Sequence, residues 1–240
     1  MPDSQMNQMG AQAFSEMKKN TPRETRSEVI RYVQCIGQRI AAVSGSSLPA
    51  EQWETVVFKD ESANAFALPG GKMGVHTGLL RVAKTDGQLA AVMGHEVGHV
   101  LARHGSERVS ESLVTSLGLQ ATAAILGDSH SPKKGLLMAA LGIGAQFGVL
   151  LPHSRTQESE ADWIGLKLMA QAGFDPRESA ELWRNMMKDG GKAPPEILST
   201  HPASDRRIRD LEARIPEAMP LYEEAIRRGG ASDCRRPAGI

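Results

Sequence analysis

Two histidines with a glutamate between them, His95, Glu96 and His99, have the clearest chemical potential in the sequence. Residues four apart lie one turn apart on the same helix face, so both imidazoles can reach one metal ion. Zinc accepts neutral nitrogen ligands, and a catalytic zinc keeps one of its four positions for water. Glu96 would flank the ion without binding it and could take a proton from the activated water. The spacing therefore predicts the metal-binding and general-base part of a hydrolase.

The residues around this motif indicate a helix over residues 86–104. Thr85 suits its N-terminus. Gly94 and Gly98 each cost about 1 kcal/mol relative to alanine in a helix interior, so we interpret them as points where another backbone approaches. A core helix with two hydrogen-bonded histidines is the alternative, and the context of the motif disfavours it. The apolar seam of the predicted helix consists of Leu89, Val92, Val97, Val100 and Leu101.

A second helix, predicted after Ser154 and continuing to Ala172, supplies a further candidate ligand. Glu158 and Asp162 are four apart and share one face. A carboxylate from a second helix is a known third ligand beside two histidines. Glu158 would bind the ion, and Asp162 would accept the outer N–H of a ligating histidine and fix its tautomer. A charged helix face is the alternative, and without the upstream histidines it would be preferred.

Other polar residues near these motifs receive structural interpretations. Arg103 and His104 would end the first helix as cations that suit its dipole. Glu160 is expected to point away from the site into solvent. His76 is expected to be an exposed strand residue rather than a ligand.

Residues 53–78 predict a small antiparallel sheet ahead of the metal-binding helix. A β-prone segment is followed by a strand, a Pro-Gly-Gly turn and another strand, which is a hairpin signal. Its edge could pair with an extended substrate backbone, giving affinity that depends little on side chains. An ordinary sheet edge is the alternative. The predicted substrate-binding edge strand contains Asn64, Ala65, Phe66 and Ala67.

The whole chain limits the possible classes of protein. It has 240 residues, enough for one large domain or two small ones. Lys+Arg and Asp+Glu both number 28, and this zero net charge argues against a nucleic-acid binder. Residues 1–19 are polar and amphipathic, without the apolar run of a secretory signal, and a trimmed mature form stays possible.

The predicted organisation has three parts. Residues 1–50 form an N-terminal helical clasp on the core, residues 51–215 the catalytic domain, and residues 216–240 a short helix starting at Pro216 with a mobile tail. Residues 107–151 form a helical hairpin in the catalytic domain. Its apolar runs are short or interrupted by polar residues, which favours a hairpin that is buried or touches a membrane surface or partner over two membrane spans.

The two cysteines, Cys35 and Cys234, lie far apart and in no metal-binding motif. They are either unrelated thiols or a disulfide that ties the C-terminal tail to an early helix. A disulfide would imply an oxidising compartment. Pairing depends on geometry, so the sequence leaves both interpretations open.

Four motifs together resemble the gluzincin zinc metallopeptidases of family M48. They are residues 64–71 (NAFALPGG), 95–99 (HEVGH), 158–162 (ESEAD) and 199–202 (STHP), in the order found in that family. The family includes the CAAX prenyl endopeptidase and the bacterial heat-shock membrane protease. The resemblance covers about residues 51–211 and is closest to soluble members of the bacterial envelope. It implies an α+β, mostly helical, zincin-like core.

The resemblance also implies roles for individual residues. His95, His99 and Glu158 would bind one Zn²⁺, with Glu96 as general base and Asp162 as the partner of a ligating histidine.

Two downstream residues, His201 and Arg207, match family positions that face the site. Either could stabilise the oxyanion, and His201 could instead occupy the open position of zinc in a self-inhibited resting state. A loop histidine is the alternative for His201.

The expected function is therefore a zinc endopeptidase that cleaves unfolded or misassembled polypeptides in quality control of the bacterial periplasm or cell envelope. Contact with a membrane or an envelope protein would involve residues 109–151. The alternative function is a zinc-stabilised chaperone or adaptor that holds clients at the sheet edge without cleaving them. Intact general-base and ligand positions count against that alternative, because a pure binder has no use for Glu96. Multiple membrane spans and a following repeat domain, present in some relatives, are missing from this sequence, and its oligomeric state is left open.

Overall fold

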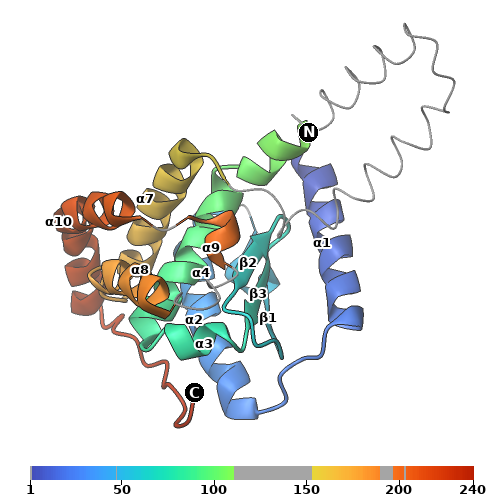
Figure 1. The fold of residues 1–240 in the computed structure, drawn as a ribbon, viewed down its shortest axis with the longest axis horizontal. Coiled ribbons are helices and arrows are strands. Elements are labelled where there is room, and N and C mark those ends of the chain that lie inside the picture. Colours follow the sequence, from blue (N-terminus) through green and yellow to red (C-terminus); the bar gives the residue numbers. More distant parts are fainter. Residues whose placement is uncertain (1, 47, 111–152, 190–196, 203) are drawn as a thin grey trace, which may run out of the picture.

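The computed structural model describes residues 2–46, 48–110, 153–189, 197–202 and 204–240. Helices surround one small sheet (Figure 1), which confirms the predicted α+β, mostly helical class. The elements are α1 (Asp3–Asn20), α2 (Ser27–Val43), the 3₁₀ helix η1 (Ala50–Gln52), β1 (Glu54–Phe58), β2 (Ala65–Leu68), β3 (Lys72–His76), α3 (Leu79–Val82), α4 (Asp86–Leu101), α7 (Arg155–Gln171), α8 (Glu178–Asp189), α9 (Ile197–Thr200) and α10 (Asp205–Arg227).

The sheet is mixed, so the prediction of a wholly antiparallel sheet was wrong. Its strand order is β1-β3-β2. The predicted hairpin of β2 and β3 is antiparallel, with Ala65 opposite Val75. β1 and β3 are parallel, with Glu54 opposite Lys72. The difference arises because β3 inserts between β1 and β2, and a hairpin signal does not report which of its strands will meet an earlier one.

Helix α4 lies at the centre of the molecule, between the sheet and the helices α7 and α8 (Figure 1). Every residue from Gly87 through His99 is buried. A helix enclosed on all sides is expected to be apolar all round. The polar side chains of α4 are accordingly limited to Asp86 and Gln88 in its first turn and to the motif residues His95, Glu96 and His99. The Thr85 hydroxyl accepts a hydrogen bond from the Gln88 N–H at 3.1 Å, as predicted for its N-cap.

Glycines bring α4 and α7 into backbone contact, as the sequence predicted. A Cβ on Gly98 would lie 2.8 Å from the Ala161 carbonyl oxygen, and one on Gly94 would lie 2.9 Å from that of Gly165. A Cβ on Gly165 would in turn lie 2.7 Å from the His95 nitrogen. These contacts place α7 against the motif turn of α4.

We expect Gly98→Ala to lower the free energy of unfolding by about 1–3 kcal/mol, because the methyl group meets rigid backbone. Helix propensity alone would predict a gain of about 1 kcal/mol in the free energy of unfolding. The sign of the measured change therefore distinguishes the backbone contact from propensity. Gly87→Ala is the comparison on the same helix: its Cβ would lie 2.8 Å from Glu178 Cγ, a side-chain atom rather than backbone, so its loss of stability should be smaller. Denaturant unfolding of both variants measures the effect. Stabilisation by Gly98→Ala would contradict this packing.

The N-terminal helices cover two sides of the core. The Phe14 side chain of α1 packs edge-on against Phe58 and Phe66 on the sheet face away from α4. The apolar face of α2, with Val33 and Ile36, belongs to the main core. The division into a clasp, a catalytic domain and a C-terminal part stays a prediction.

His76 is buried, so the expectation of an exposed strand residue was wrong. Its Nδ1 lies 2.8 Å from Ser62 Oγ, and its ring stands edge-on to Phe58 and Phe66. The reason is packing on the sheet face: Phe58 and Phe66, from the strands on either side of β3, cover the imidazole.

The C-terminal region differs from its prediction in two ways. Pro216 does not start a new helix: α10 is continuous and contains both Pro216 and Pro220. Packing of α10 on α7 and α8 outweighs the local cost of proline. The tail beyond α10 is held rather than free, because Cys234 forms a disulfide with Cys35 of α2. Arg236 also donates hydrogen bonds to the Leu80 and Ala83 carbonyls.

The helical hairpin predicted over residues 107–151 lies outside the described residues from residue 111 onwards. Within the described ranges, no helix has both the length and the apolar character needed to cross a bilayer.

Candidate metal centre and active site

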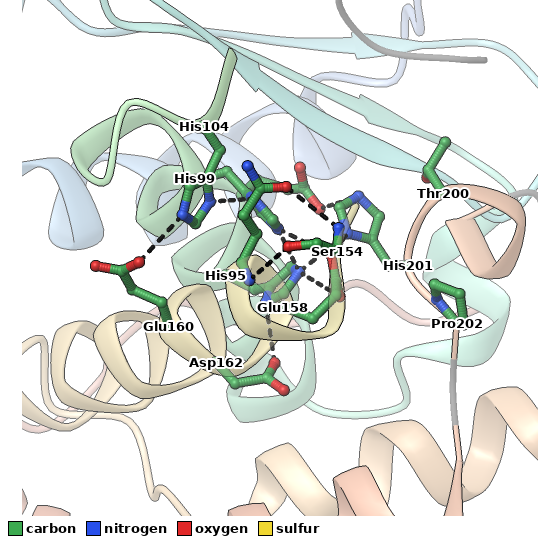
Figure 2. A network of polar contacts seen from close by, with 12 residues as sticks. His95, His99, His104, Ser154, Glu158, Glu160, Asp162, Thr200, His201 and Pro202 are labelled. Atoms are coloured by element: carbon green, nitrogen blue, oxygen red, sulfur yellow. Dashed lines mark hydrogen bonds and ion pairs between the residues drawn. The ribbon is translucent and has the colours of Figure 1, made fainter. Parts of the chain in front are cut away.

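The two motif helices present their polar residues to each other. On α4, His95 and His99 face α7, as their four-residue spacing predicts. On α7, Glu158 and Asp162 face α4 (Figure 2). Ser154 starts α7 with a capping box, in which its hydroxyl and the Gln157 side chain bond each other's backbone N–H groups.

Four potential metal-ligating atoms converge at this interface: His95 Nε2, His99 Nε2, Glu158 Oε1 and His201 Nδ1. The two Nε2 atoms are 3.0 Å apart. His201 Nδ1 lies 3.1 Å from His95 Nε2 and 2.8 Å from Glu158 Oε1. Zinc bonds of about 2.0–2.2 Å in a tetrahedron separate their ligands by about 3.3–3.6 Å. The observed separations of 2.8–3.1 Å are a few tenths of an ångström shorter than these, so small outward shifts of the side chains would place this donor set around one ion.

The protonation of the two clearest ligands suits a cation. Burial lowers the pKa of His99, which keeps its imidazole neutral at physiological pH. Burial by itself would raise the pKa of Glu158, but the surrounding histidines and Arg207 outweigh it and lower the pKa. A neutral imidazole and an ionised carboxylate are the forms in which these side chains bind metal.

Asp162 occupies the place predicted for it. Its Oδ1 lies 3.0 Å from His95 Nδ1, the ring nitrogen that points away from the converging atoms. Arg207 holds this carboxylate with Nε and Nη2, both at 2.7 Å, and lies 2.7 Å from Glu158 Oε2 through Nη1. Its guanidinium also stacks on Trp183, with Cζ 3.6 Å from the ring centroid. Arg207 is thus anchored behind the ligands by two carboxylates.

Glu96 stands beside the converging atoms without joining them. It is buried, and its Oε1 makes no hydrogen bond to any described residue. The same oxygen lies 3.4 Å from His201 Nε2. A buried carboxylate oxygen without a partner is rare in folded proteins and marks a place for a water or a substrate group.

A cavity of about 300 Å³ opens in front of Glu96, His99 and His201. Three residues of the predicted substrate strand, Ala65, Phe66 and Ala67, line it. The fourth, Asn64, precedes β2, and its carbonyl accepts a hydrogen bond from the His76 N–H. The edge strand β2 is therefore one wall of the cavity that reaches the candidate metal centre.

Sequence reasoning missed two residues that contact the site, His104 and Glu160. His104 is not an exposed cation at a helix end: it is 2% exposed, and its Nδ1 lies 2.8 Å from His99 Nδ1. Glu160 is exposed, as expected, but its carboxylate lies 3.3 Å from His104 Nε2, a contact that the sequence did not indicate. The cause is the chain path, because α4 ends at Leu101 and Arg103 takes a positive φ of 61°. Five-residue spacing gives no helical signal for this contact.

A third missed residue is His153, whose ring lies over that of His99 with centroids 3.9 Å apart. Burial, together with the charge of Arg108, lowers the pKa of His153 to about 3. No spacing rule connects it with α4, since it precedes α7.

Comparison with known proteins decides the family. The model of peptidase family M48 matches residues 28–215. The chain belongs to peptidase family M48. This confirms the resemblance, and membership in a metallopeptidase family implies a metal.

Named relatives of this M48 chain are metalloendopeptidases or proteases. It is 42% identical over 205 residues to the mitochondrial metalloendopeptidase OMA1 of Schizosaccharomyces pombe, covering 85% of this chain and 56% of the relative. With OMA1 of Arabidopsis thaliana it shares 39% identity over 186 residues, or 77% of this chain and 36% of the relative. The β-barrel assembly-enhancing protease of Escherichia coli is 27% identical over 224 residues, which cover 91% of this chain and 45% of the relative. This chain thus spans between 36% and 56% of these relatives.

Proposed function

We propose that this M48 chain is a zinc-dependent endopeptidase. The observation that carries the proposal is the convergence of four ligand atoms beside a buried Glu96, whose Oε1 makes no hydrogen bond to any described residue, at the end of a cavity. His95, His99 and Glu158 would hold zinc. Bound there, zinc would act as a Lewis acid on the scissile carbonyl and lower the pKa of the attacking water.

The protein's own groups would handle the protons and the developing charge. Glu96 accepts the proton of the attacking water and delivers it to the leaving amine, as a general base and then a general acid. His201 is the fourth ligand of the resting state, supported by its 2.8 Å contact with Glu158 and its burial. In the working state its imidazole donates a hydrogen bond to the oxyanion. Arg207 supports the site through Asp162 and Glu158, and it is the second candidate for the oxyanion.

The proposed substrates are unfolded or misassembled polypeptides. An extended chain added to the edge of β2 would be bound through its backbone, which suits clients of varied sequence. We place this activity in quality control of the bacterial periplasm or envelope. The similarity to the E. coli β-barrel assembly-enhancing protease supports this setting. The Cys35–Cys234 disulfide supports an oxidising compartment. The mitochondrial relatives make the mitochondrion the competing location.

Metal removal tests the proposal. Chelation should abolish cleavage of unfolded casein, and one equivalent of zinc should restore it, because Glu96 alone cannot activate water strongly. Product fragments are followed by mass spectrometry. Cleavage by metal-free protein would contradict the proposal. If casein stays soluble but uncut after zinc has been added back, the result would favour the chaperone or adaptor function instead.

A further inference from the structure

The two candidate histidine ligands have different supports. His95 Nδ1 meets Asp162, whose carboxylate is fixed by Arg207. His99 Nδ1 meets another imidazole, that of His104, at 2.8 Å. His104 in turn reaches Glu160 through its Nε2, at 3.3 Å, and Figure 2 shows this chain leading away from the ligand atoms. Neither His104 nor Glu160 is among the residues to which the resemblance assigned a role.

Metal binding fixes every proton in this chain of contacts. A neutral His99 that binds metal through Nε2 must carry its proton on Nδ1. His99 therefore donates to His104 Nδ1, which accepts. A neutral His104 that accepts at Nδ1 carries its proton on Nε2, and this proton points to the Glu160 carboxylate, an acceptor. Each donor in the series from His99 through His104 to Glu160 thus meets an acceptor, and both imidazoles are neutral.

The local fold holds His104 in place for this contact. Its side chain is 2% exposed, and the left-handed turn at Arg103 directs the chain back so that the two rings meet, with centroids 4.9 Å apart. Glu160 is on the same helix as Glu158 and Asp162, so α7 supports both histidines. Partners of this kind orient a ligating histidine and raise its basicity.

We propose that His104, oriented by Glu160, is a positioning residue that fixes the tautomer and ring orientation of His99 for metal binding. The proposal rests on the proposed zinc site. A second metal held by His99, His104 and His153 is the rival explanation for this cluster. It would require His99 to bind one metal through each nitrogen and therefore to lose both ring protons.

Zinc affinity, measured by competition with a chromophoric chelator, tests the proposal. His104→Leu should raise the zinc dissociation constant about 10–100-fold. His104→Asn should stay within a few-fold of the unmutated protein, because the amide oxygen can replace Nδ1 as acceptor. Glu160→Gln should likewise change the zinc affinity little, since its amide oxygen accepts the same proton. Glu160→Leu should lower the zinc affinity several-fold. His76→Leu is the matched control, a buried histidine outside the metal cluster, and should leave zinc affinity unchanged.

Two further readouts separate positioning from simple packing. Denaturant unfolding of the metal-free variants shows whether His104→Leu still folds. In the zinc-loaded, unmutated protein, ¹⁵N-detected imidazole spectra should show His99 protonated on Nδ1 and His104 on Nε2. This spectral test does not depend on any variant folding.

Several results would overturn the proposal. The first is an unchanged zinc affinity in His104→Leu. The second is an equal loss of zinc affinity in His104→Leu and His104→Asn. The third is a His104 ring proton found on Nδ1. Two zinc ions per chain would support the rival site. If the unmutated protein binds no zinc at all, the proposed function fails, which distinguishes that failure from a failure of the His104 role.

Discussion

Replacing Glu96 with glutamine should lower kcat for peptide hydrolysis by about 10²–10⁴-fold and leave zinc binding intact. Glutamine has nearly the same shape but cannot accept the proton of water. None of the four converging ligand atoms belongs to Glu96, so the metal should stay bound. Its Oε1 has no hydrogen-bond partner among the described residues, so the substitution removes at that atom only the 3.4 Å ion-pair contact with His201 Nε2. The measurement is zinc per chain together with steady-state cleavage of a casein-derived peptide.

Glu61→Gln is the control for this variant. Glu61 lies on the surface, paired with Arg81, and its loss should change neither zinc nor kcat. Full turnover by zinc-loaded Glu96→Gln protein would show that another group is the base. Loss of zinc from that variant would mean that Glu96 is a ligand, contrary to the geometry described above.

Replacing Arg207 with methionine should destabilise the metal-free protein by about 3–5 kcal/mol, the usual cost of removing one partner of a buried ion pair. Arg207 is 7% exposed and is paired with two buried carboxylates, those of Asp162 and Glu158. Methionine can still pack on Trp183 but leaves both carboxylates without their cation. Denaturant unfolding at neutral pH measures the loss. Asp162→Asn in the Arg207→Met background should recover part of it.

The neighbouring arginine provides a matched control. Arg206 is exposed, and its ion pair with Asp210, one turn further along α10 with Nε 3.5 Å from Oδ2, is a surface contact. Arg206→Met should therefore change stability by no more than about 0.5 kcal/mol. Equal effects of the two substitutions would contradict a structural role for the Arg207 ion pairs.

The same ion pairs determine the response to acid. Burial would raise the pKa of Asp162, but Arg207 and His95 outweigh it and lower the pKa below its usual 3.8. A carboxyl whose pKa is lowered by folding contributes stability above its unfolded pKa and loses it as the pH falls towards the folded value. The Asp162 contribution is therefore present at neutral pH and disappears only below about pH 4.

The site could be predicted from sequence to the extent that its contacts follow helix periodicity. His95 with His99, and Glu158 with Asp162, each lie one turn apart, and the structure places both pairs at one interface. The glycines of α4 predicted the close approach of a second backbone.

Contacts set by chain path rather than by periodicity were not predictable. The parallel pairing of β1 with β3 depends on strand insertion, and the contact of His104 with His99 depends on a left-handed residue at Arg103. The continuity of α10 through Pro216 depends on tertiary packing, which outweighs local propensity. The disulfide joins residues 199 positions apart, so spacing alone could not decide it.

The most direct test of the central claim is zinc X-ray absorption spectroscopy on the purified, zinc-loaded protein. The account predicts one zinc per chain, surrounded by nitrogen and oxygen ligands at about 2.0–2.1 Å with at least two imidazoles. Substituting His95 or His99 should remove imidazole scattering. A sulfur shell at about 2.3 Å, fewer than two imidazoles, or no bound zinc would contradict the metal centre described here.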